Sequence, residues 1–321
     1  MMARIFRVLQ CLVGASLLVG AGLVRAQSEG SVPDPQDPSE VAPDSVIGVW
    51  QYDASARLNA SQAAYRNWEE GAGNGSLAFT ASMGGQASQR GEHWIQAHEL
   101  RLAFGLINQD DQELRKSEDQ IRWNSSLRYE GERFFRLFNP TMAANLRTQF
   151  AKGFDYSSNP FESEEGVPSG DPRARRPLPV QTSAFFSPAF ITESLGLTYE
   201  PAADFTMRLG AASKQTIVLE RDFRVLYGVD DENTSRVELG ADFAASVDRA
   251  LTDNIRYRSQ LNVFFSFNQP ENPPDALWEN TISLEVNDWL STDLQFVALY
   301  DQDITRAIQL KETISVGVSF N

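Results

Sequence analysis

Apolar and polar residues alternate along most of this chain with a period of two. Between residues 121 and 130 the odd positions are mainly apolar and the even positions are polar or charged, and an equivalent alternation recurs at 235–248, 255–267, 277–287 and 309–320. Because a β-strand turns successive side chains to opposite faces, each segment is predicted to be a strand with one apolar face. We therefore predict an all-β fold.

The same pattern along the whole chain gives about 12 strands, each near the ~9–11 residues that a tilted strand needs to cross a bilayer. They are expected near residues 54–62, 76–88, 94–107, 121–130, 133–150, 185–199, 205–219, 235–248, 255–267, 277–287, 290–300 and 309–320. Short connections fall at 89–93, 131–132, 200–204, 249–254 and 288–289. Longer ones fall at 63–75, 108–120, 151–184, 220–234, 268–276 and 301–308.

Interleaved short and long connections are typical of outer-membrane barrels, which have short periplasmic turns, long extracellular loops and an even strand count. The predicted architecture is therefore a transmembrane, up-and-down antiparallel β-barrel. A soluble β-sandwich or a lipocalin-like barrel is the alternative, and either would turn its apolar face inward. Alternation alone does not say which face is inside, although the loop order and the charges on the polar face favour a wet lumen.

Aromatic residues gather beside the short connections. They are Trp94, Tyr129, Phe134, Tyr199, Phe205, Tyr257 and Trp289. Amphipathic rings at one level of a barrel form the aromatic girdle of a membrane interface. Ordinary strand propensity is the alternative explanation, since aromatic residues favour strands in any sheet. The clustering at the short-turn ends favours the girdle.

The N-terminal 26 residues have the order of regions found in a secretory signal peptide. Two arginines precede an uncharged apolar run, Val8–Val24, and cleavage is expected after Ala26. A membrane-anchoring helix is the alternative, because the run is close to the lower spanning limit. Residues 27–45 are acidic and proline-rich and are expected to be a disordered linker, so the barrel is expected to occupy residues 46–321.

Charge and cysteine usage narrow the possible chemistry. The net charge of −15 argues against a nucleic-acid partner, because binding a phosphate backbone requires clustered Lys and Arg. The single cysteine, Cys11, lies in the predicted leader, so the mature chain is expected to have neither a disulfide nor a cysteine metal site. Barrel closure or a core must then hold the secreted chain together.

The polar faces of the predicted strands carry charges of both signs, which we expect to line the lumen. These residues are Glu99, Arg101, Arg122, Arg128, Glu130, Arg147, Arg208, Arg236, Glu238, Asp242, Arg256, Arg258, Glu279, Glu285, Asp293 and Lys311. One interpretation is a charged permeation path with a selectivity field, and the other is a salt-bridged plug. Strand number does not decide, because roughly 8 strands fill with side chains whereas roughly 16–18 leave a channel.

Few residues are suited to catalysis. His93 and His98 are the only imidazoles, and His98 has no evident serine and acid partners, so we expect no catalytic residue and no enzyme. The connection 151–184 holds acidic residues followed by arginines, but it lacks the regular spacing of a calcium loop. We expect no metal site and no cofactor. This loop could instead fold inward as a constriction or bind a ligand.

Several short motifs, in order along the chain, are similar to those of one family. They are Asn67-Trp68 with Gly71-Ala72-Gly73-Asn74, Arg115–Asp119, Thr148–Phe150 with Gly153–Tyr156, Ser187–Phe190, Gly196–Pro201, Val286–Ser291, Tyr300-Asp301 and Gly317–Phe320. The chain thereby resembles, from about Trp50 to Phe320, a family of outer-membrane β-barrel domains catalogued as domain of unknown function 3078. Its first motif differs from the family pattern Asn-Trp-x-x-Gly-Gly-x-Asn by an extra small residue. The resemblance implies a barrel in the outer membrane and implies no activity.

These observations lead us to expect a passive, porin-like channel for small solutes in the outer membrane. A non-conducting structural or binding barrel in envelope organisation is the alternative. A continuous polar lumen would favour the channel, whereas ion pairs that close the bore would favour the scaffold. The expected partners are outer-membrane lipid and the barrel-insertion machinery, which would recognise the C-terminal strand ending in Phe320-Asn321.

Overall fold

The structure is a computed structural model. It describes residues 47–64, 75–109, 113–163, 167, 170–202, 204–287, 290–302 and 305–318. The predicted signal peptide and linker, the motif at Asn67–Asn74 and the terminal Phe320 lie outside these residues. No helix among the described residues is long and apolar enough to cross a membrane.

Twelve long strands form one antiparallel sheet in chain order. They are β1 (Trp50–Ala64), β2 (Gly75–Arg90), β3 (Trp94–Gln109), β4 (Arg115–Tyr129), β5 (Phe138–Thr148), β8 (Ala189–Ala202), β9 (Phe205–Ile217), β10 (Ser235–Thr252), β11 (Ile255–Ser266), β12 (Asp275–Asn287), β13 (Leu290–Asp301) and β14 (Thr305–Val318). The fold is therefore all-β and up-and-down, as the alternation predicts. Two short strands, β6 (Gly153–Asp155) and β7 (Val180–Ser183), pair inside the long connection between β5 and β8.

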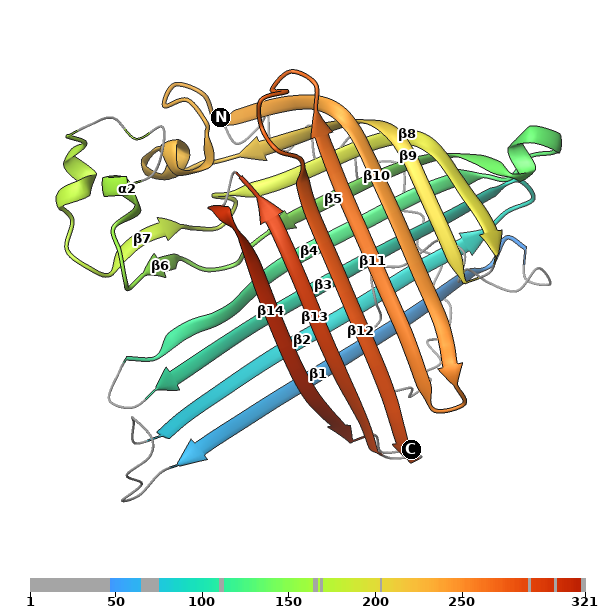
Figure 1. Cartoon of the computed structure of the whole chain (residues 1–321), viewed down its shortest axis with the longest axis horizontal. Coiled ribbons are helices and arrows are strands. Elements are labelled where there is room, and N and C mark those ends of the chain that lie inside the picture. The colour runs from blue at the N-terminus through green and yellow to red at the C-terminus, as the bar shows by residue number, and fades with distance from the viewer. Residues whose placement is uncertain are drawn as a thin grey trace.

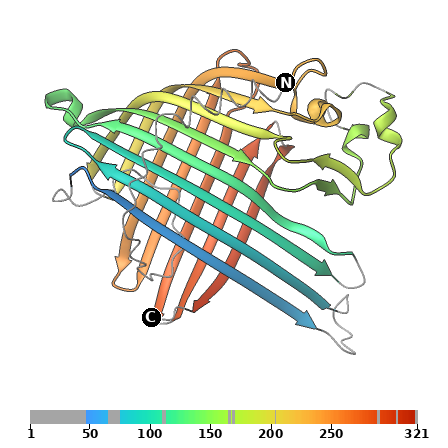
Figure 2. The same ribbon diagram turned by 180° about the vertical axis from the view of Figure 1, so that it is seen from behind.

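The main sheet is curled into a barrel. Figure 1 shows β10–β14 in front and β1–β4 behind, with the two sets of strands crossing, and the view from behind in Figure 2 agrees. Within the described residues, the hydrogen-bonded order begins at β1 and ends at β14. Strands six places apart in this order, such as β4 and β12, consequently lie on opposite walls.

The apolar face of the sheet points outward. Large apolar side chains are exposed on strands around the barrel, including Met83, Leu100, Phe104, Met142, Leu195, Leu209, Leu239, Phe265, Trp278, Leu294, Leu310 and Ile314. Leu195, Leu209 and Leu310 are 62%, 61% and 65% exposed. The soluble alternatives require the opposite orientation, with these side chains in a core, so this chain does not form either of them.

Several strands extend beyond their predicted bounds, as β4 does by beginning at Arg115 rather than 121, and two others start late for local backbone reasons. The segment predicted as a strand from 133 opens with a short helix, η2 (Arg133–Arg136), and extension resumes only at Phe138. Arg133 has a φ of 56°, which breaks the extended path. The next predicted strand starts at Ala189 rather than at 185, because Ala184 and Ser187 close a tight turn with Phe186 at a φ of 52°.

Two long connections fold together into a small cap at one end of the barrel. The cap contains α2 (Pro160–Ser163), η3 (Pro172–Arg175) and η4 (Arg221–Tyr227), and Figure 1 shows it projecting beyond the strand ends with β6 and β7. Its own apolar cluster consists of Phe161, Val180, Val218, Phe223, Leu226 and Val229. The sequence left open whether loop 151–184 folds inward, and the described part of this loop instead shares an apolar core with the neighbouring η4 loop.

Close backbone approach fixes glycine at one point of the sheet. Gly196 of β8 is paired with Gly210 of β9. A Cβ added to Gly196 would overlap the carbonyl oxygen of Leu209 and lie 2.6 Å from the Cα of Gly210. Because both obstacles are backbone atoms, they cannot rotate away, and the two strands would have to separate.

We predict that Gly196→Ala lowers the stability of the folded barrel by about 1–3 kcal/mol, the usual cost of overpacking. Gly85→Ala is the matched control, because a Cβ at Gly85 meets nothing within 4 Å among the described atoms. Urea unfolding in detergent micelles, followed by tryptophan fluorescence, measures both. Equal midpoints for the two variants would show that the β8–β9 approach is not tight.

Candidate functional site

The barrel interior contains a cavity of about 360 Å³ walled by residues from β2 round to β13. The charged residues of its wall are Glu99, Arg122, Arg147, Arg208, Lys214, Asp242, Asp275, Glu279 and Asp301. Amide and hydroxyl residues lie between them, including Asn124, Asn145, Thr192, Ser194, Gln260 and Asn262. The polar face of the alternating strands therefore forms the lumen.

One ion pair crosses the lumen from wall to wall. Nη1 of Arg122, on β4, donates to Oε1 and Oε2 of Glu279, on β12, at 3.3 and 3.1 Å. The two side chains are only 10% and 12% exposed. Because β4 and β12 are on opposite walls, this contact bridges the bore.

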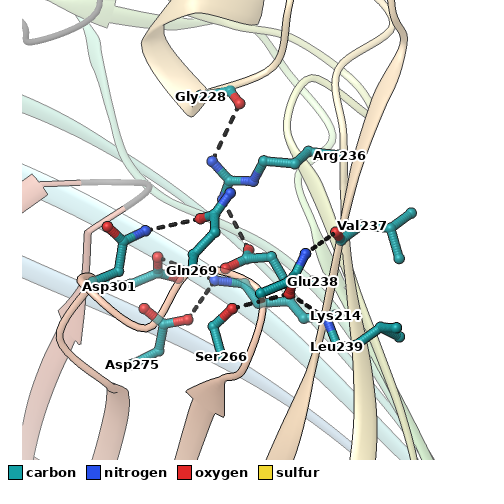
Figure 3. Close-up of polar contacts among 12 residues, drawn as sticks. Lys214, Gly228, Arg236, Val237, Glu238, Leu239, Ser266, Gln269, Asp275 and Asp301 are labelled. Atoms are coloured by element: carbon teal, nitrogen blue, oxygen red, sulfur yellow. Dashed lines mark hydrogen bonds and ion pairs between the residues drawn. The ribbon is translucent and has the colours of Figure 1, made fainter.

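A second transverse connection is a chain of four charges. Arg147 of β5 donates through Nη2 to Asp301 of β13 at 3.0 Å. Nζ of Lys214, on β9, lies 2.5 Å from Asp275 and 3.5 Å from Asp301, and Figure 3 shows it between these carboxylates. Both cations also make cation–π contacts with the Phe190 ring. The Arg147 guanidinium carbon lies 4.8 Å and the Lys214 ammonium 5.6 Å from the centre of the ring. This ring limits the space beside the chain of charges.

One wall of the lumen carries a row of three arginines, and three acids lie opposite it. Arg101, Arg122 and Arg147 are cross-strand partners in register on β3, β4 and β5, so they form a basic row. The opposing wall carries Asp275 and Glu279 on β12 and Asp301 on β13. Glu99 moderates the basic row by pairing with Arg101 and accepting a 3.0 Å hydrogen bond from Asn124. The separation of sign produces an electric field across the lumen.

The other predicted lumen residues are paired along the walls or lie near the strand ends. Wall pairs join Arg208 to Asp242, Arg236 to Glu238, Arg128 to Glu130 and Glu200, and Arg256 and Arg258 to Asp248. Arg236 also donates to the carbonyl of Gly228, which ties the cap to the barrel mouth (Figure 3). Asp293 is half-buried on β13, Glu285 is exposed, and Lys311 pairs with Glu118 at 3.4 Å.

Lys214, Asp275 and Asp301 belong to the lumen but were not among the predicted residues. Lys214 shares the face of Arg208 on the same strand, so the period of two could have identified it. Asp275 and Asp301 fall at the ends of β12 and β13, in segments predicted as loops. Strand ends are the least certain part of a pattern-based prediction, which is why both acids were missed.

Several predicted girdle aromatics contact each other near the short connections. Trp94 and Tyr129 lie 5.0 Å apart between ring centres. Phe134 stacks on Phe138, which stacks on Tyr199. Phe134, however, lies on η2 rather than on a strand. The Tyr257 hydroxyl donates to Asn280, and Trp289 lies outside the described residues, so the girdle stays a prediction.

His98 has a serine partner that the sequence pattern did not reveal. Ser125 is its cross-strand neighbour, and the Oγ–Nδ1 distance is 2.9 Å. The expectation that His98 lacks a serine is therefore wrong. Trp50 stacks on the ring at 5.9 Å, and the buried Nε2 has no hydrogen-bond partner among the described residues. A catalytic triad would need an acid at that nitrogen, and none of the described residues supplies one.

The motif Arg115–Asp119 anchors the base of the cap. The Asp119 carboxylate accepts the backbone N–H groups of Phe150 and Ala151 at 2.7 and 2.9 Å. Lys116 bonds to this carboxylate and to the carbonyl of Ala151. The Arg115 guanidinium lies 4.0 Å from the centre of the Tyr156 ring. Two of the motifs that suggested a family are thus in contact across β4 and β5.

Within the cap, Asp171 organises η3 through its partner Arg173. Its carboxylate accepts the Arg173 backbone N–H at 2.8 Å, and the guanidinium Nε and Nη2 at 2.9 and 2.6 Å. The hydrogen bonds from the Arg173 side chain, followed by the backbone bond, lower the pKa of Asp171 below its ordinary value. Arg176 and Asp222 then join this loop to η4 at 2.8 Å.

Among the residues described, no group of three or more His, Cys, Asp or Glu side chains is placed to hold a metal ion. Asp155 and Asp171 of loop 151–184 instead accept hydrogen bonds from the loop's own backbone. Asp155, for example, accepts the N–H groups of Ser157 and Ser158 at 2.8 and 2.9 Å.

Residues 60–154 match the model of a family described as protein of unknown function (DUF3078). This match confirms the resemblance to that family, and the motifs after residue 156 lie beyond the matched range. No curated protein matches the sequence.

Two solved structures are similar to this chain at 10% identity. One is the COG4313 outer membrane channel from Pseudomonas putida F1, with a TM-score of 0.38 and coverage of 90% of this chain and 98% of that chain. The other is a Pseudomonas aeruginosa FadL homologue, with a TM-score of 0.29 and coverage of 83% of this chain and 72% of that chain.

We predict that Asp171→Asn loosens the cap by about 1–2 kcal/mol at pH 7, because the variant loses a charge-assisted cap of η3. Hydrogen–deuterium exchange over residues 159–176 measures the loss, with the exposed Glu232→Gln as control. A carboxylate with a lowered pKa stabilises the fold above its unfolded pKa of about 3.9 and ceases to do so as the pH falls through the lower folded value. Wild-type protection should therefore persist to about pH 4, and an earlier loss would contradict this role.

Proposed function

We propose that this protein is an outer-membrane barrel that passes small polar solutes through a narrow, charge-lined lumen. The observation that carries the proposal is the orientation of the sheet, with large apolar side chains outside and most charged side chains of the strands inside, around a cavity. A protein surrounded by water would bury the first set and expose the second. A bilayer is the solvent that favours the arrangement found here.

The outer surface supports insertion in a membrane. Exposed apolar residues occur on β2, β3, β5, β8, β9, β10, β11, β12, β13 and β14, and thus around the sheet rather than in one patch. A local patch would indicate a protein partner, whereas an apolar surface on nearly every strand fits lipid. Paired strands also satisfy the backbone hydrogen-bonding groups, which lipid cannot do.

The lumen supports passage of polar solutes. Its wall combines charged groups with amides and hydroxyls on strands from β2 to β13. A void lined by so many polar groups is expected to hold water, because dry cavities in proteins are apolar. The transverse pairs narrow the bore, so only small solutes would pass.

A second candidate function, a non-conducting scaffold or binding barrel, is favoured by those same transverse pairs. Arg122–Glu279 and Arg147–Asp301 span the bore, and side chains that meet in this way would act as a plug if they never separate. The two candidates therefore differ in one property, the passage of ions.

The remaining parts of the proposal concern targeting. Residues 1–26 would direct export across the inner membrane, residues 27–45 would form a periplasmic linker, and the C-terminal strand would be recognised by the barrel-insertion machinery. In this proposal the predicted lumen residues line the path of the solute, and the predicted girdle residues lie at the membrane interface. The tyrosine and tryptophan rings beside the short turns would then mark the periplasmic membrane interface.

The proposal predicts discrete current steps from the purified, folded chain in a planar bilayer. Asp301→Asn should make the current more anion-selective, because it releases Arg147 into the lumen and removes a negative charge. Asp222→Asn is the matched control, since it removes the same charge from an exposed pair in the cap. Its selectivity should equal that of the wild type.

A folded barrel without current steps would contradict the channel and leave the scaffold as the better account. Folding is checked independently by the change in gel mobility on boiling. An equal change of selectivity in Asp222→Asn would instead contradict the role of Asp301, because the change would not be specific to a lumen charge.

A further inference from the structure

The Arg122–Glu279 pair has unused hydrogen-bonding capacity on both sides. Both hydrogen bonds from the Arg122 guanidinium leave from Nη1, so Nε and Nη2 have no partner among the described residues. Glu279 accepts only from Arg122 among the side chains described. Both residues form part of the cavity wall. A donor fork and a carboxylate are thus available to a solute at one level of the lumen.

The neighbouring transverse chain differs in this respect. Asp301 is shared by Arg147 and Lys214, and Lys214 is shared by Asp275 and Asp301. Phe190 covers the two cations. Each of these charges is therefore paired with another member of the chain. The Arg122–Glu279 pair, which keeps donor and acceptor atoms open, is the better place for a ligand.

The field across the lumen determines which ligand charge fits. A free anion drawn to the basic row of Arg101, Arg122 and Arg147 also faces Glu99 and Glu279. A free cation drawn to Glu279 faces Arg122. A molecule with a carboxylate at one end and an ammonium at the other satisfies both walls, and it loses less on leaving water because both charges are paired.

We propose that the lumen binds small zwitterions of the amino-acid type beside the Arg122–Glu279 pair, in contact with both residues. The ligand carboxylate accepts from Nε and Nη2 of Arg122 in the side-on, bidentate geometry that guanidinium groups favour. The ligand ammonium donates to Glu279. The cavity of about 360 Å³ is within the size range of small-molecule sites and accommodates a short amino acid. This inference rests on the proposed function, because a solute reaches the site only through the lumen.

The test is equilibrium binding of glycine to the folded, full-length mature chain in detergent micelles, measured by ligand-observed NMR titration. Acetate and methylammonium serve as probes because each carries one of glycine's charges. Wild-type protein should bind glycine at least about tenfold more tightly than either probe, the change expected for one charge-assisted contact. Arg122→Gln and Glu279→Gln should each lower glycine affinity by about the same factor.

Each variant should lose recognition of one ligand charge and keep recognition of the other. Misfolding would abolish both, so it would not reproduce this pattern. Glu279→Gln should bind acetate about as well as glycine, and Arg122→Gln should bind methylammonium about as well as glycine. Arg176→Gln removes one member of an exposed pair in the cap, far from the cavity wall, and should leave glycine binding unchanged. The gel-mobility shift on boiling confirms that each sample is folded.

The outcomes separate this inference from the proposed channel. Current steps without preferential glycine binding would overturn the zwitterion site and leave the channel intact. Glycine binding that follows the pattern above, but without current steps, would support the site and overturn the channel. Equal binding of glycine, acetate and methylammonium to every variant would overturn the site, whatever the conductance.

Discussion

The structure depends on one constraint, which is that each long strand must pair with its neighbours in the sheet while turning alternate residues to two different environments. Pairing satisfies the backbone groups, and the period of two then sorts the side chains. Once the apolar set faces outward, the charged residues of β3, β4, β5, β9, β12 and β13 have only the interior in which to lie. The lumen and its charge network follow from that sorting.

The interior charges are arranged in a way that a random mixture would not produce. Arg101, Arg122 and Arg147 are neighbours in register, and Arg122 and Arg147 pair with acids on the far wall. Repulsion within the basic row is offset by pairing across the bore and by Glu99 beside it. In a dry interior such pairs would carry a large desolvation penalty, whereas a wet lumen reduces it. The same arrangement gives the bore a dipolar character.

The cap shows how long loops acquire a fixed place without filling the barrel. Its apolar cluster comes from two connections that are separate in sequence, and polar links such as Asp119 to Phe150 and Arg236 to Gly228 fasten it to the barrel rim. Because these loops bury their apolar residues against each other, nothing drives them into a polar lumen. The bore is narrowed by strand side chains instead.

The sequence by itself determined the fold class, the strand count and the face on which most lumen charges lie, because a period of two is a local property that every strand repeats. It also indicated Arg122 and Glu279 as members of the polar face. It did not pair them, since β4 and β12 are 157 residues apart at this contact and only sheet curvature brings their side chains together. The inward or outward sense of the faces, the His98–Ser125 contact and the shared core of the cap were likewise decided by tertiary structure, because each depends on which distant segments become neighbours.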